Sequence, residues 1–169
     1  MHELGIVKRN IRRADKAAID KLSRFGSATV HEAMGRVGLM KPYMRPIYAG
    51  AQACGTAVTV LLQPGDNWMM HVAAEQLQPG DIVVAACTAD NTDGFFGDLL
   101  ATSFRARGAV GLVIDGGCRD VRSMAAFGER DRAVHGMLAS GKRDRVVQGI
   151  LVSVQRPRPA RLEFWVSRA

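Results

Sequence analysis

Apolar residues follow two patterns along this chain, one with the period of a helix and one that is continuous. Residues that recur every three or four positions share one side of a helix. Short runs rich in β-branched residues are typical of strands buried on both faces. The first pattern predicts helices over 15–25, from Ser27 or Thr29 to near Gly35 or Gly38, from Asp66 to Leu77, and over 95–107. The second predicts strands over 56–62, 81–86 and 110–114.

Glycine and proline separate these segments. Gly26 and Gly108 are expected to end the helices that precede them. Pro64–Gly65 and Pro79–Gly80 are expected to turn the chain between a strand and its neighbouring element. Strands that alternate with helices indicate an α/β fold with a partly parallel sheet.

The stretch from Phe95 to Asp120 is the centre of this arrangement. Its predicted helix and strand are followed by Asp115, Gly116 and Gly117, and then by Arg119 and Asp120, where the next helix should begin. In open α/β sheets, ligands bind at the carboxyl ends of the strands. A permanent cation beside a carboxylate at such a position therefore indicates a site.

The region after about Met124 has a less regular pattern. GILVSVQ and LEFWV are candidate strands, and a Pro-Arg run separates them.

Length and composition are those of one soluble domain. The chain has 169 residues, of which 47% are hydrophobic and 23% charged. It contains neither an apolar run long enough to span a membrane nor the apolar stretch of a secretory signal. The chain has three cysteines, an odd number, at Cys54, Cys87 and Cys118. They are widely spaced and do not match a zinc-binding pattern. We therefore interpret them as small buried residues in a reducing cytoplasm.

The net charge of +7 does not by itself predict nucleic-acid binding. Acids and bases are roughly balanced up to Ala125. Most of the excess follows Phe127, at Arg130, Arg132, Lys142, Arg143, Arg145, Arg156, Arg158, Arg161 and Arg168. We favour a solvated or disordered tail over a nucleic-acid face.

Four segments resemble one family of enzymes. They are SATVHEAMGRVGLM, RPIYAGAQACGTAVTV, GDNWMMHVAAEQLQPGDIVV and FFGDLLATSFRARGAVGLVIDGGCRDV. They resemble the 4-hydroxy-4-methyl-2-oxoglutarate and 4-carboxy-4-hydroxy-2-oxoadipate aldolases. That superfamily also contains RraA, the protein inhibitor of ribonuclease E. The most specific feature is Asp98 followed, after twenty residues, by Arg119 and Asp120.

The resemblance implies a fold and an activity. The expected fold is an α/β sandwich with a swivelling β/β/α-type core over 1–169, family-like over about 7–124. The expected activity is that of a class II lyase in protocatechuate and gallate degradation. It releases pyruvate and a second oxo acid, with oxaloacetate decarboxylation as a side activity. The resemblance also implies a cytoplasmic homotrimer or hexamer that needs Mg²⁺ or Mn²⁺. A small oxo acid is the expected partner, rather than nucleic acid or a membrane.

The resemblance also assigns roles to residues. Asp120 is expected to hold the metal, Arg119 to bind the enolate oxygen or a substrate carboxylate, and Asp98 to orient a water that exchanges protons. The backbone amides of Gly97, Asp98, Leu99 and Leu100 are expected to bind the oxo acid. The residue chemistry agrees, because a guanidinium and free amides at a helix start both favour anions.

Simpler interpretations stay open for each residue. An Arg-Asp pair is often a solvated surface pair, and Asp98 is also suited to cap a helix. His71 is typical of a core or interface position, and Trp68 of packing. Asp115 is suited to hydrogen-bond the loop that follows it.

The region 125–169 departs from the family. Ser123 stands where an acidic residue is frequent, and no counterpart is found for the acidic residue of a neighbouring subunit. One hypothesis is that a frame shift or truncation replaced the C-terminus, which resequencing would test. The alternative function is that of a non-catalytic, RraA-like regulator that binds ribonuclease E.

Overall fold

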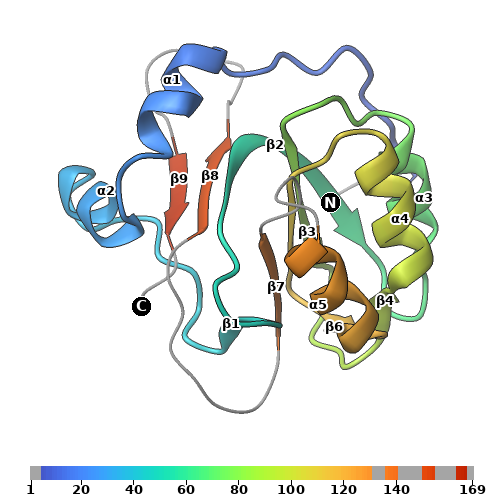
Figure 1. Cartoon of the computed structure of the whole chain (residues 1–169). Coiled ribbons are helices and arrows are strands. Elements are labelled where there is room, and N and C mark those ends of the chain that lie inside the picture. Colours follow the sequence, from blue (N-terminus) through green and yellow to red (C-terminus); the bar gives the residue numbers. More distant parts are fainter. Residues whose placement is uncertain (1–4, 131–135, 141–149, 155–162, 167–169) are drawn as a thin grey trace.

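A computed structural model describes residues 5–130, 136–140, 150–154 and 163–166. Figure 1 shows a sheet with helices on one side and two further helices beside its β8–β9 edge. The helices of the described part are α1 (Lys16–Leu22), α2 (Ser27–Ala33), α3 (Trp68–Ala74), α4 (Asp98–Ala106) and α5 (Val121–Arg130). The strands of the main sheet are β1 (Met44–Pro46), β2 (Ala53–Leu62), β3 (Asp81–Cys87), β5 (Gly111–Ile114), β7 (Gly136–Ser140), β8 (Ile150–Val154) and β9 (Glu163–Val166).

The main sheet has the strand order β1-β7-β5-β3-β2-β8-β9. Its five inner strands pair in parallel, and β1 and β9 pair antiparallel at the two edges. A second, two-stranded ribbon joins β4 (Gly94–Phe96) to β6 (Gly117–Cys118) in parallel. The predicted α/β class with a partly parallel sheet is therefore confirmed.

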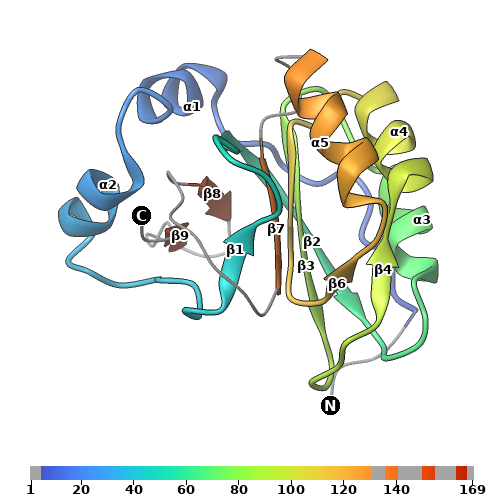
Figure 2. The ribbon, with the colours of Figure 1, turned by 60° about the horizontal axis from the view of Figure 1, so that its bottom comes forward.

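The main core lies between the sheet and the layer formed by α3, α4 and α5. The turned view of Figure 2 shows these three helices on the same side of the sheet. Successive parallel strands need a crossover, and here the helices form the crossovers. The apolar positions of α4 agree with this, because Leu100 and Phe104 are one turn apart and both buried. Phe104 packs against Phe96 with ring centroids 5.2 Å apart.

The predicted helix over 95–107 begins later than expected. It starts at Asp98, because Phe95 and Phe96 belong to β4 instead. Both phenylalanines are buried, with 2% and 1% of their surfaces exposed. Their pairing with β6 fixes them in extended backbone, so their helical spacing from Leu99 and Leu100 was coincidental.

The N-terminal helix is also shorter than predicted. Asp15 caps α1 by accepting a hydrogen bond from the Ala18 amide at 2.9 Å. The helix ends at Leu22, and Phe25 beyond it is 53% exposed. The helix contains no buried residue, so its apolar stripe is not fully covered within the described part of the chain.

The C-terminal region supplies strands to the sheet. The candidate strands GILVSVQ and LEFWV contain β8 and β9, while β7 was not predicted. The basic residues that carry the excess charge fall outside the described residues, apart from Arg130, whose side chain is not described. In the ranges that are described, no helix is both long and apolar enough to cross a bilayer.

A partly buried ion pair fixes the N-terminal segment to the start of β3. Arg13 donates to both carboxylate oxygens of Asp81, through Nε at 3.2 Å and Nη2 at 2.7 Å. The Asp81 side chain is 1% exposed, and it also accepts from the Gln78 amide at 2.8 Å. Arg13 makes further bonds to the carbonyl oxygens of Ile11 and Gln76.

We expect Arg13→Met to lower the free energy of unfolding by about 3–5 kcal/mol, because Asp81 would stay buried without its counter-charge. Urea unfolding followed by circular dichroism measures the change. Lys16→Met is the matched control, since Lys16 pairs with Asp20 on the surface and should contribute less than about 1 kcal/mol. Equal losses in the two variants would contradict this role for Arg13.

A second prediction concerns Gly55 in β2, whose Cα faces the backbone of the turn before β3. A Cβ at this position would overlap the carbonyl oxygen of Gly80, which accepts from the Thr56 amide at 3.2 Å. Since backbone cannot yield cheaply, we expect Gly55→Ala to cost about 1–3 kcal/mol. Gly26→Ala, with no heavy atom within 4 Å of the new methyl, is the control. A thermal melting midpoint for Gly55→Ala equal to the wild type would disprove this packing constraint.

Candidate functional site

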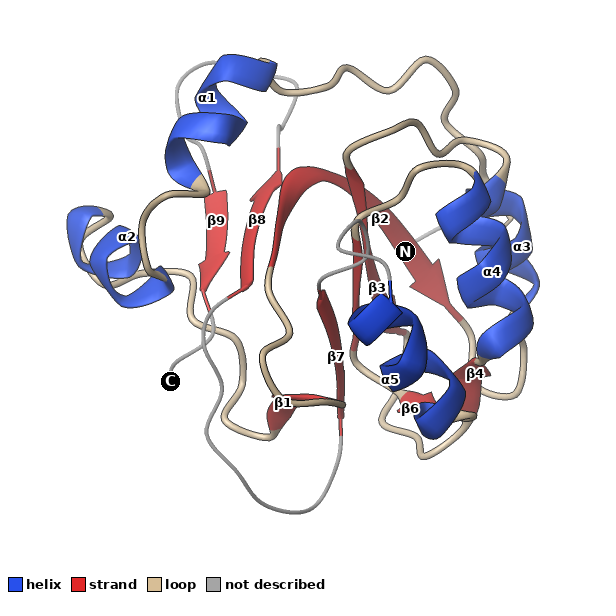
Figure 3. Ribbon diagram, viewed as in Figure 1, coloured by secondary structure: helices blue, strands red, loops and turns tan. Residues whose placement is uncertain are grey.

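The predicted site residues lie where α4 and α5 begin. Figure 3 shows both helices leaving the ribbon of β4 and β6 at one end of the molecule. This end follows the carboxyl termini of β3 and β5, because the chain enters the ribbon after each of these strands. The location agrees with the expected ligand-binding edge of an α/β sheet.

Asp120 joins the two helix starts. Its carbonyl oxygen accepts from the Met124 amide at 3.0 Å in the first turn of α5, and its Oδ2 accepts from the Asp98 amide at 3.3 Å at the start of α4. Its φ angle is 54°, a left-handed conformation that aspartate tolerates better than most residues. The positive ends of two helix dipoles therefore act on one carboxylate.

Arg119 is held by its backbone and by β4. Its amide donates to the carbonyl oxygen of Phe96 at 2.8 Å. Its side chain runs over Gly94, where a Cβ would lie 2.7 Å from Arg119 Cγ. Arg119 is exposed, and within the described ranges no carboxylate forms an ion pair with it. Its guanidinium is therefore available to an anionic ligand.

The residues predicted to bind the oxo acid have different environments. Gly97 is extended at the N-cap of α4, and a Cβ there would lie 2.6 Å from Asp120 Oδ2. Asp98 is the first residue of the helix and is partly exposed, and its amide already donates to Asp120. Leu99 is 84% exposed, whereas Leu100 is buried in the core. The amides of Leu99 and Leu100 belong to the first turn, which has no intrahelical acceptors.

Three residues to which the sequence analysis assigned no role support this arrangement. Asn67 donates from Nδ2 to the carbonyl oxygen of Phe95 at 3.2 Å, which joins the start of α3 to β4. Asp93 accepts from the Gly65 amide at its carboxylate and from the Gly117 amide at its carbonyl oxygen, both at 2.8 Å. The third residue is Gly94, under Arg119. The signal for this loop was its sequence DNTDG, because Asp and Asn favour turns closed by their own side chains.

The remaining candidates have simpler roles. His71 is exposed on α3, with its ring centroid 6.2 Å from that of Trp68. Trp68 is itself 66% exposed, so the expectation that it packs is wrong. Asp115 accepts from the distant Tyr43 hydroxyl at 2.9 Å.

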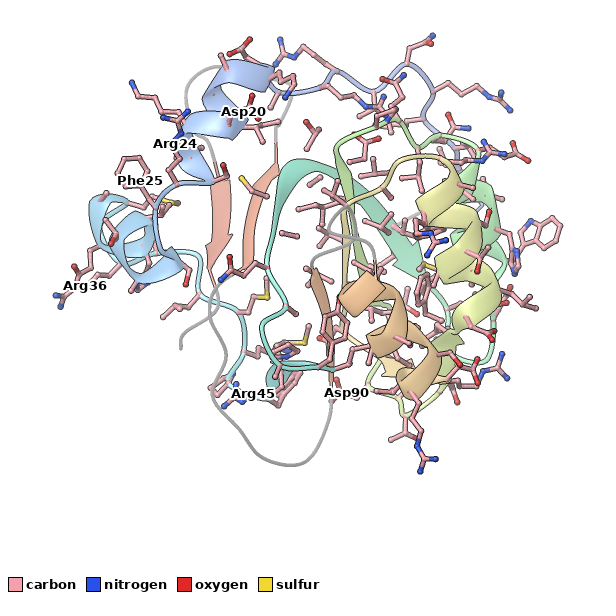
Figure 4. The ribbon with its side chains drawn as sticks, in the orientation of Figure 1. Asp20, Arg24, Phe25, Arg36, Arg45 and Asp90 are labelled. Carbon is pink, nitrogen blue, oxygen red and sulfur yellow. The ribbon has the colours of Figure 1, made fainter. Side chains whose placement is uncertain are left out.

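The charges near this end of the molecule are mixed. Burial raises the pKa of the Cys118 thiol to about 12, so the thiol is neutral near pH 7. The pKa of Lys41 is raised, mainly by a hydrogen bond and a charge interaction with Tyr43 and more weakly by Asp115 and Asp90. Lys41 therefore stays a cation. Figure 4 shows Asp90 at the lower edge of the view, where Arg45 also lies.

The donor set fits a hard divalent cation better than zinc. Among the residues that the structure describes, no group of three or more His, Cys, Asp or Glu side chains is placed to hold a metal. Asp120 supplies one carboxylate, and its Oδ1 has no hydrogen-bond donor among the described residues. Mg²⁺ and Mn²⁺ accept such a site, since Mg²⁺ commonly uses one or two carboxylates and keeps several waters.

Comparisons with known proteins agree with this fold. A family model described as RraA-like (Aldolase/RraA) matches residues 27–155, which include every predicted site residue. A protein of Halalkalibacterium halodurans, whose name provisionally assigns it as a 4-hydroxy-4-methyl-2-oxoglutarate aldolase, is 28% identical over 114 residues. The match covers 66% of this chain and 54% of that protein, so the chain spans about half the length of this curated relative.

Two solved structures resemble the chain in fold. Streptomyces coelicolor RraAS2, described as an unusual member of the RNase ES inhibitor RraA protein family, has a TM-score of 0.61 at 23% identity. The similarity covers 81% of this chain and 68% of RraAS2. The RNA-processing inhibitor RraA from Thermus thermophilus has a TM-score of 0.54 at 16% identity, over 74% of this chain and 76% of that one. At these identities the similarity shows the fold alone.

Proposed function

The chain belongs to the RraA-like family of aldolases and RraA proteins, and on that premise we propose that it is a divalent-metal-dependent lyase. Its proposed substrates are 4-hydroxy-4-methyl-2-oxoglutarate and 4-carboxy-4-hydroxy-2-oxoadipate, with pyruvate as the common product and oxaloacetate decarboxylation as a side activity. One observation carries the proposal. The exposed guanidinium of Arg119 lies in the sequence next to Asp120, whose carboxylate is oriented by the Asp98 amide through Oδ2. The Oδ1 atom of Asp120 accepts no hydrogen bond from the described residues.

Binding of the oxo acid is assigned to the chain's own cationic and amide groups. The substrate's 1-carboxylate would accept from the first-turn amides of Leu99 and Leu100, where the α4 dipole favours an anion. Arg119 would donate to the 2-oxo oxygen. Asp120 would hold Mg²⁺ or Mn²⁺, which when bound supplies Lewis-acid polarisation of the 2-oxo group.

Cleavage of the C3–C4 bond then needs one proton to move. Asp98, acting through a water, would accept the proton of the C4 hydroxyl while the C3–C4 electron pair moves into the pyruvate enolate. The C4 hydroxyl becomes the carbonyl of the second oxo acid. Arg119 stabilises the negative charge that grows on the enolate oxygen, and the same water returns a proton to C3. Atoms and charge balance without any further reactant.

We further propose that the chain forms a homotrimer or homohexamer and that it is located in the cytoplasm. The family match supports assembly into oligomers, and light scattering on the purified chain would test the number of subunits. The alternative, a non-catalytic regulator that binds ribonuclease E, has less support. The similarity to RraA structures is one of fold alone, whereas the Asp98, Arg119 and Asp120 arrangement offers chemistry that a binder does not need.

The proposal predicts metal-dependent pyruvate release from 4-hydroxy-4-methyl-2-oxoglutarate. A lactate dehydrogenase-coupled assay should show activity with Mg²⁺ or Mn²⁺, loss with chelator and recovery when the cation is returned. A folded chain that releases no pyruvate from either substrate under these conditions would remove the lyase proposal. Co-purification with ribonuclease E in that case would favour the regulator.

Substitutions at the two central residues should separate their roles. Asp120→Asn keeps an acceptor for the Asp98 amide and tolerates the left-handed backbone, so it should fold normally. It should lower kcat/KM by about 100-fold or more, because several kcal/mol of Lewis-acid stabilisation would be lost.

Arg119→Met should lower kcat by about 100- to 1000-fold with Mn²⁺ affinity unchanged. Arg119→Lys keeps the charge but loses the planar fork, so it should recover only part of the rate. Steady-state kinetics and Mn²⁺ titration measure these effects. Wild-type rates in both Arg119→Met and Asp120→Asn would rule out the assigned mechanism.

A further inference from the structure

Glycines at both ends of β4 lie against the two central residues of the site. Gly94 begins the strand and Gly97 follows it, while Phe95 and Phe96 between them are buried in the core. The strand is paired with β6, so that Gly94 faces Gly117 and Phe96 faces Cys118. This pairing places Arg119 and Asp120, the next two residues after β6, beside the same short strand.

The closest contact differs between the two glycines. A Cβ at position 94 would lie 2.7 Å from Arg119 Cγ and 3.1 Å from its Cδ. A Cβ at position 97 would lie 2.6 Å from Asp120 Oδ2, and 3.8 Å from Arg119 Cβ, which is an ordinary van der Waals distance. One glycine therefore leaves room for the stem of the guanidinium, and the other leaves room for the carboxylate.

Backbone conformation does not explain these glycines. Neither has a positive φ, and Gly97 is extended with φ −153° and ψ −170°. Any residue adopts such a backbone, so the requirement at these positions is space for a neighbouring side chain.

The backbone around Gly94 is itself fixed. Asp93, directly before it, accepts hydrogen bonds from the amides of Gly65 and Gly117, both at 2.8 Å. Arg119 is attached on the other side through its amide bond to Phe96 at 2.8 Å. A methyl group added at position 94 would therefore displace the more mobile partner, the exposed Arg119 side chain, and leave the strand in place.

We propose that Gly94 and Gly97 are positioning residues that set the Arg119 guanidinium and the Asp120 carboxylate independently of each other. The inference deepens the lyase proposal and rests on it for the roles of the two side chains. The contacts themselves are testable without turnover. No chemistry is assigned to either glycine.

The first experiment observes Arg119 directly. In a ¹⁵N NMR spectrum, the Nε–H signal of Arg119 is assigned by its absence in Arg119→Met. Gly94→Ala should shift this signal, while Gly97→Ala and the control Gly26→Ala should leave it in place. An unshifted Arg119 signal in a folded Gly94→Ala variant would overturn the proposal, whether or not the chain is a lyase.

The second experiment uses Mn²⁺ and oxalate, a dianion shaped like the pyruvate enolate. Gly97→Ala should weaken Mn²⁺ binding, measured by electron paramagnetic resonance, by about 10-fold or more, as loss of an outer-shell contact does. Gly94→Ala should change Mn²⁺ affinity less than about twofold, but weaken oxalate binding to the Mn²⁺-loaded protein by about 10-fold. Weakening of both ligands by both variants would contradict independent positioning.

A double-mutant cycle separates positioning from a general structural effect. In an Arg119→Met background, Gly94→Ala should cause no further loss of oxalate affinity, because the guanidinium that it would displace is gone. An undiminished effect in that background would show that Gly94 acts by another route. Gly97→Ala introduces a methyl group that clashes with the Asp120 carboxylate. If this variant has a lower melting temperature, adding Asp120→Gly should restore it, because the clashing carboxylate is removed. A melting temperature that is not restored would also overturn the assignment.

Discussion

The hydrogen bond from the Asp98 amide to Asp120 Oδ2 is the contact on which the candidate site depends. It joins the start of α4 to the start of α5, two helices that belong to different crossovers of the sheet. A carboxylate between two helix starts is favoured by both dipoles, so it is oriented without a lysine or arginine partner. That leaves Arg119, the adjacent cation, free to serve a ligand instead of neutralising its neighbour.

The surroundings of this contact determine what kind of ligand is compatible with it. Carboxylates follow the carboxyl ends of five strands, β2 to β6. They belong to Asp66, Asp90, Asp93, Asp98, Asp115 and Asp120. An anionic oxo acid would be repelled by these groups in the absence of counter-charge. Arg119 and the amides of α4 supply part of that charge, and a divalent cation at Asp120 would supply the rest. The proposed metal requirement thus follows from the charge of the site as well as from the chemistry of bond cleavage.

The fold was largely predictable from the sequence because its central strands are unambiguous. The runs at 81–86 and 110–114 are apolar and β-branched, and they became β3 and β5. The boundary at Phe95 was not predictable, since its spacing fits a helix and only pairing with β6 makes it extended. Strand β7 was missed for a related reason, because Gly136–Ser140 has no strong β pattern and its backbone position comes from pairing with β5 and β1.

The site itself was predictable only in part. Asp98, Arg119 and Asp120 were singled out by their spacing, and the structure brings the amide of Asp98 to the Asp120 carboxylate and Arg119 beside β4. The supporting roles of Asn67, Asp93 and Gly94 were not predicted, because Asn67 and Asp93 bind backbone groups 28 residues away in the sequence and Gly94 contributes only an empty space. A glycine that is required for room has no distinctive sequence signal when its φ is ordinary.

All of the candidate chemistry lies within one continuous part of the chain. Among the described residues, the contacts that orient the site lie between Gly65, which donates to Asp93, and Met124, which donates to Asp120. They are made by residues of α3, β4, α4, β6 and α5 or of the loops beside them. The C-terminal strands β8 and β9 pair on the far side of β2, at the opposite edge of the sheet from β5. They therefore support the sheet without contributing to the described geometry around Asp120. A changed C-terminus would act on this site through the stability of the sheet or through subunit contacts, and not by removing Asp98, Arg119 or Asp120.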